Sequence, residues 1–166
     1  MHLFFFGSLT DRELLELVLG RDCSAIRFRP ARLHGYTTNR VKHESYPLLV
    51  PAPGAAVAGQ LVGVLTDTDV ARIRFFEDDE YVLETARVEI RGGHEECLVC
   101  LPRSPEADSG EAWQPESWSP DEREIFFLMT ADFMAQFGVV PHEEALEMWE
   151  EFRIRAEKRV LTRRRA

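Results

Sequence analysis

The sequence predicts an α+β fold: a small, mostly antiparallel β-barrel-like sheet flanked by helices and followed by a C-terminal helical hairpin. Two observations favour this class. The expected elements run in the order strand, helix, several strands, helix, strands and two helices, which is not the regular strand–helix alternation of a doubly wound sheet. The chain also ends in two helical segments that follow a Pro- and Ser-rich stretch.

Composition narrows the class of protein. With 166 residues, 45% hydrophobic and 30% charged, the chain is typical of a soluble globular domain. The net charge of −9 argues against a nucleic-acid or anionic-membrane partner. Three cysteines do not form a disulfide framework, and no segment is typical of a membrane span or a signal peptide. We therefore expect a cytoplasmic protein.

The N-terminal segment predicts a strand, a glycine turn and a helix. Residues 2–6 are short, continuous and aromatic, as in a fully buried strand. Gly7 follows, and Thr10 with Glu13 fits a capping box that starts a helix. Gly20 is a natural C-terminal stop.

The middle of the chain predicts most of the sheet. The expected elements are a strand at 31–36, a loop at 37–45, an extended segment at 46–51, a turn at 53–54, a strand at 56–65, a short helix ending near Glu77, and strands at 81–90 and 96–101. Prolines confine the 46–51 segment to a sheet edge or a strand end. Gly92-Gly93 joins the last two strands.

The C-terminal third changes character. We expect a domain over 1–103, a linker over 104–118 and a helical extension over 119–166. Ser119-Pro120 is a strong helix start, and the helix should run to about Phe137. Pro141 starts a last helix with an apolar stripe, so we expect the extension to pack on the barrel or to form a homodimer.

Two short motifs carry the chemistry. Free N–H groups gather where the turn at residues 7–9 enters a helix, and such groups attract anions. Glu77 directly follows Phe75-Phe76. Burial of the Glu77 carboxyl beside these rings would raise its pKa, and so would the negative charges of the acids at 78–80. A carboxyl with a raised pKa can act first as a general base and then as a general acid. The alternatives are a plain strand–turn–helix corner and a solvated acidic turn.

Other patterns favour no site. Cys97 and Cys100 have metal-ligand spacing, but residues three apart on a strand face opposite sides of the sheet, so core thiols are favoured. Consecutive acids at 77–80 point in different directions, which disfavours a metal site. A Ser8 nucleophile would lack both a partner histidine nearby in sequence and the Gly-x-Ser-x-Gly elbow.

Taken together, Phe6-Gly7-Ser8-Leu9, Tyr46-Pro47-Leu48-Leu49-Val50-Pro51 and Phe76-Glu77-x-x-x-Tyr81 resemble the gamma-glutamylcyclotransferase-like family, the AIG2-like group. The resemblance covers residues 1 to about 101. It implies a small β-barrel, no metal or organic cofactor, substrate binding at Gly7, Ser8 and Leu9, and Glu77 as the catalytic acid/base. Phe6, Tyr46 and Tyr81 are further candidate substrate-binding residues. Phe6 replaces the family's tyrosine, and Asp78 replaces its glycine.

The resemblance implies cyclisation of a γ-glutamyl amine or γ-glutamyl amino acid to 5-oxoproline, with release of the amine. The alternative is a non-catalytic binding or interaction module on the same fold, because a fold alone does not secure a function. The position of Glu77 relative to residues 6–9 discriminates between these two hypotheses.

Overall fold

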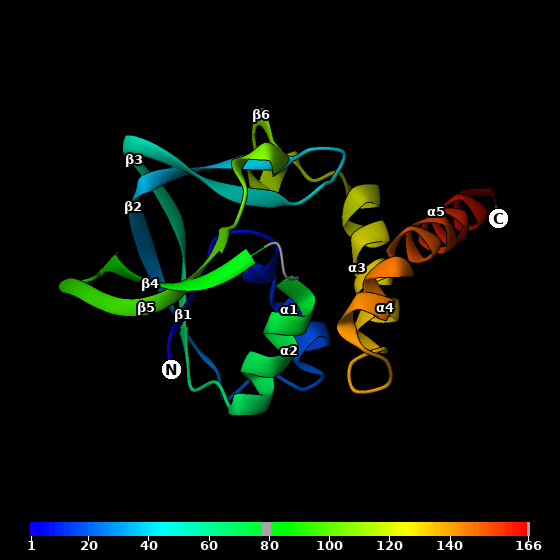
Figure 1. Ribbon diagram of the computed structural model, residues 1–166, viewed down its shortest axis with the longest axis horizontal. Helices are drawn as coiled ribbons and strands as arrows, with labels where there is room; N and C mark the ends of the chain where they lie inside the picture. The colour runs from blue at the N-terminus through cyan, green and yellow to red at the C-terminus, as the bar shows by residue number, and fades with distance from the viewer. Residues whose placement is uncertain (78–80, 166) are drawn as a thin grey trace.

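The computed structural model describes residues 1–77 and 81–165 and contains a closed five-stranded barrel (Figure 1). Its strands are β1 (Leu3–Phe5), β2 (Arg27–Val41), β3 (Pro47–Gly63), β4 (Tyr81–Ile90) and β5 (Gly93–Pro102). They hydrogen-bond in the order β3-β1-β5-β4-β2, and β2 pairs with β3 to close the ring. Only the β1–β5 pairing among these is parallel. The predicted α+β class with a mostly antiparallel barrel is confirmed.

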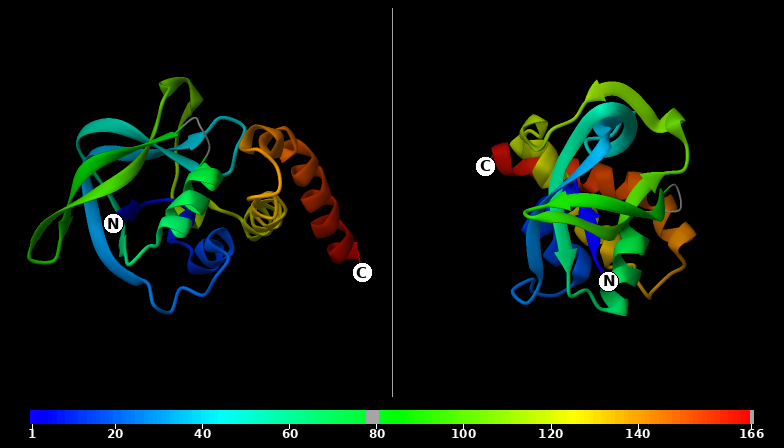
Figure 2. Two further views of the ribbon diagram at one scale, coloured as in Figure 1. Left: turned by 60° about the horizontal axis from the view of Figure 1, so that its bottom comes forward. Right: turned by 90° about the vertical axis from the view of Figure 1, so that its left-hand side faces the viewer.

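The helices lie outside the barrel. They are η1 (Ser8–Thr10), α1 (Arg12–Leu19), α2 (Asp67–Glu77), α3 (Pro120–Met134), α4 (His142–Glu147) and α5 (Trp149–Arg165). The helix predicted to start at Pro141 is therefore divided near Met148, and α3 ends three residues before the predicted Phe137. Figure 2 shows α3, α4 and α5 together on one side of the barrel, with α5 leading away from it.

The cap of α1 differs from the predicted capping box. Asp11 is the N-cap, and its carboxylate accepts hydrogen bonds from the N–H groups of Glu13 and Leu14. The Thr10 hydroxyl instead donates to the Gly7 carbonyl at 2.6 Å. The chain makes a turn of 3-10 helix before α1 begins, so the cap moves one residue along.

The long β2–β3 hairpin corrects two predictions. Residues 37–41, predicted as loop, continue β2, and residues 37–40 pair with residues 47–50. The predicted turn at 53–54 lies inside β3. Gly54 has a φ of +84°, and the β2–β3 register shifts between His34 and Tyr36. The Pro53-Gly54 pair therefore marks an irregularity within strand β3 and does not end the strand.

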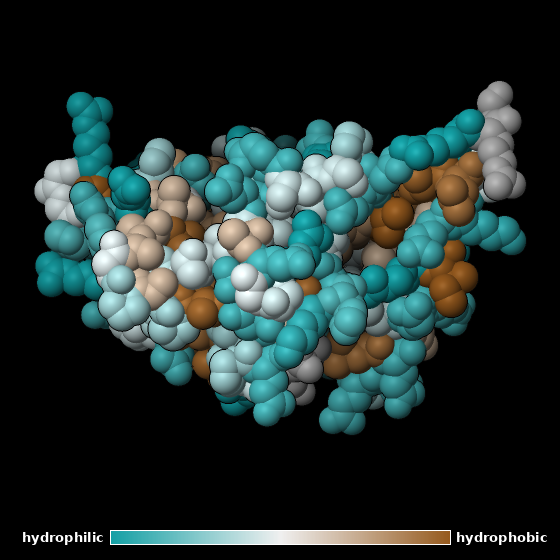
Figure 3. Space-filling model, turned by 90° about the horizontal axis from the view of Figure 1, so that it is seen from above, coloured by the Kyte–Doolittle hydropathy of each residue, from teal (hydrophilic) through white to brown (hydrophobic). Residues whose placement is uncertain are grey.

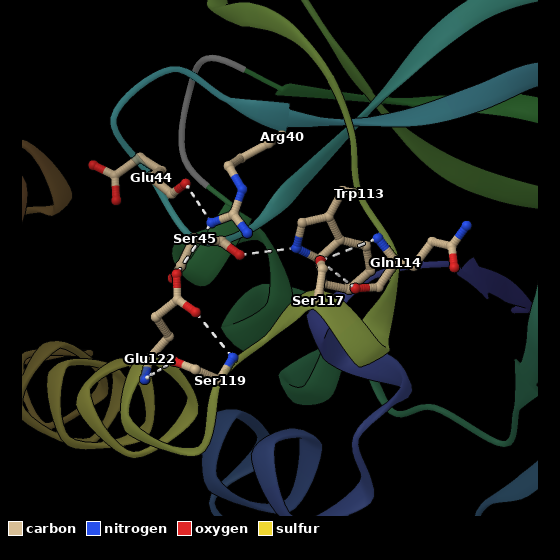
Figure 4. A network of polar contacts seen from close by, with 8 residues as sticks. All are labelled: Arg40, Glu44, Ser45, Trp113, Gln114, Ser117, Ser119 and Glu122. Atoms are coloured by element: carbon tan, nitrogen blue, oxygen red, sulfur yellow. Dashed lines mark hydrogen bonds and ion pairs between the residues drawn. The ribbon is translucent and has the colours of Figure 1, made fainter.

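The predicted linker, 104–118, contains two turns of 3-10 helix, η2 (Pro105–Ala107) and η3 (Pro115–Ser117), and a strand, β6 (Asp108–Ala112), that pairs with β2. Figure 4 shows how this segment joins the β2–β3 turn to α3. The indole N–H of Trp113 donates to the Ser45 carbonyl at 2.9 Å. Arg40 donates to the Glu44 carbonyl and to the Glu122 carboxylate.

The C-terminal helices share a core with the helices beside the barrel. Phe126, Phe133 and Phe152 belong to the same buried cluster as Leu14 and Leu15 of α1. A second cluster lies among the strands. Among the described residues, no helix is long and apolar enough to cross a membrane.

Some apolar side chains of the helical extension are exposed at the surface. Figure 3 shows apolar side chains exposed over the C-terminal helices, where Ile154 and Leu161 of α5 are 59% and 56% exposed. One face of the extension is therefore buried against the helices beside the barrel, and another face remains exposed. A homodimer through these helices stays a prediction.

Candidate functional site

A cavity of about 490 Å³ lies between the barrel, the C-terminal end of α2 and the C-terminal helices. We call it the Glu77 cavity. Every site residue predicted from the sequence lines it: Phe6, Gly7, Ser8, Leu9, Tyr46, Glu77 and Tyr81. The sequence-distant turn at 7–9 and the Glu77 carboxyl therefore meet at one site, as an anion holder and a base must if they act on one substrate.

The turn at residues 7–9 forms the start of η1. The N–H of Thr10 donates to the Gly7 carbonyl and that of Asp11 to the Ser8 carbonyl, both at 3.0 Å. These bonds begin at Thr10, and the first N–H groups of a helix have no acceptor within it. The turn itself therefore offers no acceptor to the N–H groups of Ser8 and Leu9, which are the candidate anion donors.

Gly7 is required here because a side chain at this position would not fit. Its φ is −123°, so a left-handed conformation is not involved. A Cβ on Gly7 would lie 2.5 Å from Cγ of Pro47, well inside contact distance. The absence of a side chain thus lets the Tyr46-Pro47 segment pack directly against the turn.

Glu77 is the last residue of α2, and α2 is fixed to α1 at its other end. The Arg21 guanidinium donates to the buried Asp69 carboxylate at 2.6 Å and, with desolvation opposing, lowers the pKa of Asp69 to about 2. Nε of Arg72 donates to the Val18 carbonyl at 2.7 Å. Nε2 of His142 donates to the Phe75 carbonyl at 2.9 Å, which holds the end of α2 near Glu77.

The surroundings of Glu77 shift the pKa of its carboxyl toward neutral pH. Burial of the carboxyl raises its pKa from 4.5 to about 7, and a hydrogen bond from the Cys100 thiol partly opposes this rise. Phe76 lines the cavity beside it, whereas Phe75 turns away and packs on Phe133 with 4.9 Å between ring centroids. Desolvation, one of the two causes expected, is therefore present. The acids at 78–80 lie outside the described residues.

Several cavity residues were not predicted. Cys100 was interpreted as a core thiol, yet it lines the cavity, while Cys97 lies in the second core cluster. The two cysteines thus face opposite sides of β5, as expected. The alternation of side chains along the strands is the signal that points to Cys100. Leu83 lies on the same face of β4 as Tyr81, and Cys100 is the residue opposite Leu83 on β5. The apolar residues from α3–α5 were also missed, because no local signal marks them.

Metal-binding and nucleophile patterns find no support. Within 1–77 and 81–165, no group of three or more His, Cys, Asp or Glu side chains is placed to hold a metal ion. No histidine is among the described residues that line the cavity, so a Ser8 nucleophile would have no imidazole base there.

Comparisons with known proteins agree with this geometry. Residues 3–120 match the family model described as "Gamma-glutamyl cyclotransferase, AIG2-like". Protein AIG2 A of Arabidopsis thaliana is 27% identical over 153 residues, which cover 90% of this chain and 87% of the relative. AIG2-like protein D of the same plant is 26% identical and covers 86% of this chain and 95% of the relative.

Solved structures share the fold. An AIG2-like protein from Mus musculus superposes with a TM-score of 0.54 at 19% identity, covering 72% of this chain and 90% of that one. A structure titled "Gamma-glutamyl cyclotransferase" gives a TM-score of 0.55 at 18% identity, covering 91% of this chain and 85% of that one. At these identities the likeness concerns the fold alone.

Proposed function

Because the chain belongs to the gamma-glutamyl cyclotransferase, AIG2-like family, we propose that it cyclises a γ-glutamyl amine or γ-glutamyl amino acid to 5-oxoproline and releases the amine. One observation carries the proposal. Glu77, whose pKa burial raises to about 7, lies in the same cavity as the turn at residues 7–9. A carboxyl with a pKa near the working pH is effective both as a base and as an acid.

The reaction needs a folded substrate. The N–H groups of Ser8 and Leu9 hold the α-carboxylate of the γ-glutamyl group, and this anchor presents the α-amine to Glu77. Holding the amine close to the γ-carbonyl makes ring closure an oriented intramolecular step, which supplies a large share of the barrier reduction.

A single carboxyl can carry out all the proton transfers of this reaction. Glu77 takes a proton from the α-ammonium, and the freed amine attacks the γ-carbonyl. Protonated Glu77 then gives its proton to the leaving nitrogen as the amide C–N bond breaks. Glu77, again a carboxylate, takes the second proton from the α-nitrogen as the lactam forms and passes it to the released amine, which leaves as an ammonium. Glu77 is therefore unchanged after one turnover.

The test is a panel of γ-glutamyl amines and peptides, with 5-oxoproline measured by mass spectrometry. Glu77→Gln should lower turnover by about 10²- to 10⁴-fold, the usual contribution of an acid/base group, with an unchanged circular-dichroism spectrum. Glu84→Gln is the matched control, because Glu84 is exposed on β4 and should leave turnover intact. A panel without any 5-oxoproline would favour the non-catalytic binding module.

A further inference from the structure

The C-terminal helices build one wall of the Glu77 cavity. Phe126 and Phe133 come from α3, Leu146 from α4 and Trp149 from α5. All four side chains are apolar. The rings of Phe133 and Trp149 are in contact, and none of the four residues belongs to the segment that carries the motifs at 6–9 and 77. The cavity thus has a reactive end made by the barrel and α2, and an apolar wall made by the extension.

Contacts between aromatic rings hold the wall together. The Trp149 ring packs edge-on against Phe133 with 5.4 Å between centroids and against Phe126 with 6.4 Å. Phe126 in turn contacts Tyr46 at 5.6 Å and Phe76 at 6.2 Å. This continuous aromatic surface runs from the residue next to Glu77 to Trp149. Such preformed apolar surfaces suit the body of a ligand, while a few polar groups orient it.

The charged groups at the cavity already have partners. Of the described lining residues, Lys42, Glu44 and Glu77 carry the ionisable charges of Lys, Arg, Asp or Glu type. The Glu44 carboxylate accepts a 2.6 Å hydrogen bond from Arg153 of α5. Nζ of Lys42 donates to the Glu106 carbonyl at 2.7 Å. A released amino acid would bring a second carboxylate, and none of the four wall residues from the C-terminal helices carries a cation to receive it.

We propose that the aromatic wall of Phe126, Phe133, Leu146 and Trp149 is the leaving-group subsite, and that it selects γ-glutamyl amides of apolar, aromatic amines over those of amino acids. This inference rests on the proposed function and names its substrate class. The γ-glutamyl group occupies the end at residues 7–9 and Glu77. The aromatic part of the amine then packs on Phe126 and Trp149, where burial of its ring excludes water.

The test compares kcat/KM for γ-glutamyl-phenethylamide, γ-glutamyl-methylamide and γ-glutamyl-alanine. We expect the phenethylamide to exceed each of the other two by tenfold or more, mainly through KM. Trp149→Ala should reduce the phenethylamide-to-methylamide ratio by tenfold or more. Leu161→Ala is the matched control, because Leu161 is exposed on the same helix and should leave that ratio as it is.

A binding measurement separates the subsite from folding defects. The Glu77→Gln variant keeps Trp149, and calorimetry on it should rank the phenethylamide at least tenfold tighter than the alanine conjugate. Equal affinities there, or similar kcat/KM for all three substrates in the unaltered protein, would overturn the aromatic subsite while leaving the cyclotransferase in place. No 5-oxoproline from any of the three would overturn the proposed function, and the leaving-group subsite with it.

Discussion

Gly7 and Pro47 pack so closely that a Cβ on Gly7 would lie 2.5 Å from Cγ of Pro47. This contact joins two of the three motifs identified in the sequence, and it sets the position of the turn whose residues line the cavity. The Tyr46-Pro47 segment therefore acts as a support for the turn.

Gly7→Ala should destabilise the protein by about 1–3 kcal/mol, the usual cost of overpacking a tight site, and should weaken 5-oxoproline binding. Urea unfolding and calorimetry measure the two effects. Gly93→Ala is the control, since a Cβ there would meet nothing within 4 Å. The interpretation of Gly7 would be wrong if both variants were equally stable.

The titration of Glu77 should appear in the pH dependence of stability. Its pKa is raised from 4.5 to about 7 in the folded protein, so folding favours the protonated carboxyl. This stabilisation is complete below pH 4.5 and is lost as the pH rises through about 7. Relative to Glu77→Gln, the unaltered protein should lose on the order of 3 kcal/mol over this window. Denaturant unfolding at a series of pH values measures the difference, and parallel curves would contradict it.

Cys100 should tune the base. Its thiol donates to the Glu77 carboxylate and lowers the pKa of that group. Cys100→Ala removes the donor, so the acid limb of the pH profile of kcat/KM should move to higher pH, away from its starting position near 7. Cys100→Ser keeps a donor and should move it less. Cys97→Ala, on the opposite strand face, is the control and should leave the limb in place.

Removal of residues 117–166 should give an insoluble or strongly destabilised protein. Phe126, Phe133 and Phe152 are 4%, 1% and 3% exposed and lie in one core with α1. Without them, the apolar face of α1 would meet water. Removal of 162–166, beyond the buried Val160, is the milder control. A soluble, fully folded 1–116 fragment would instead identify the extension as an independent module.

The residues that the sequence predicted to share a site line one cavity, whereas parts of the sheet were predicted wrongly. The helix-entry turn and the buried carboxyl are local features, so residues 7–9 and Glu77 could be recognised from neighbouring side chains. Their convergence could be expected only from the family resemblance. The β2–β3 hairpin was misjudged because a Pro-Gly pair usually marks a turn. Pro53 and Gly54 instead lie inside β3, at the register shift between two stretches that pair with β2.

The apolar wall could not be predicted from local patterns. Apolar residues at helical spacing in α3 and α5 indicate only that some face is buried. Whether that face meets another helix or borders a cavity depends on how the extension docks. Contacts far apart in sequence decide this, such as the ion pairs of Arg123 with Asp11 and of Arg153 with Glu44.

The division of the cavity between two parts of the chain has a consequence for evolution and for engineering. The family model ends at residue 120, and the wall residues of α3, α4 and α5 all follow it. In the reaction and the subsite that we propose, proton transfer and substrate choice are thus encoded in separate stretches of sequence. A lineage, or a designer, can exchange the helical extension to reach new amines while the barrel and its acid/base stay untouched.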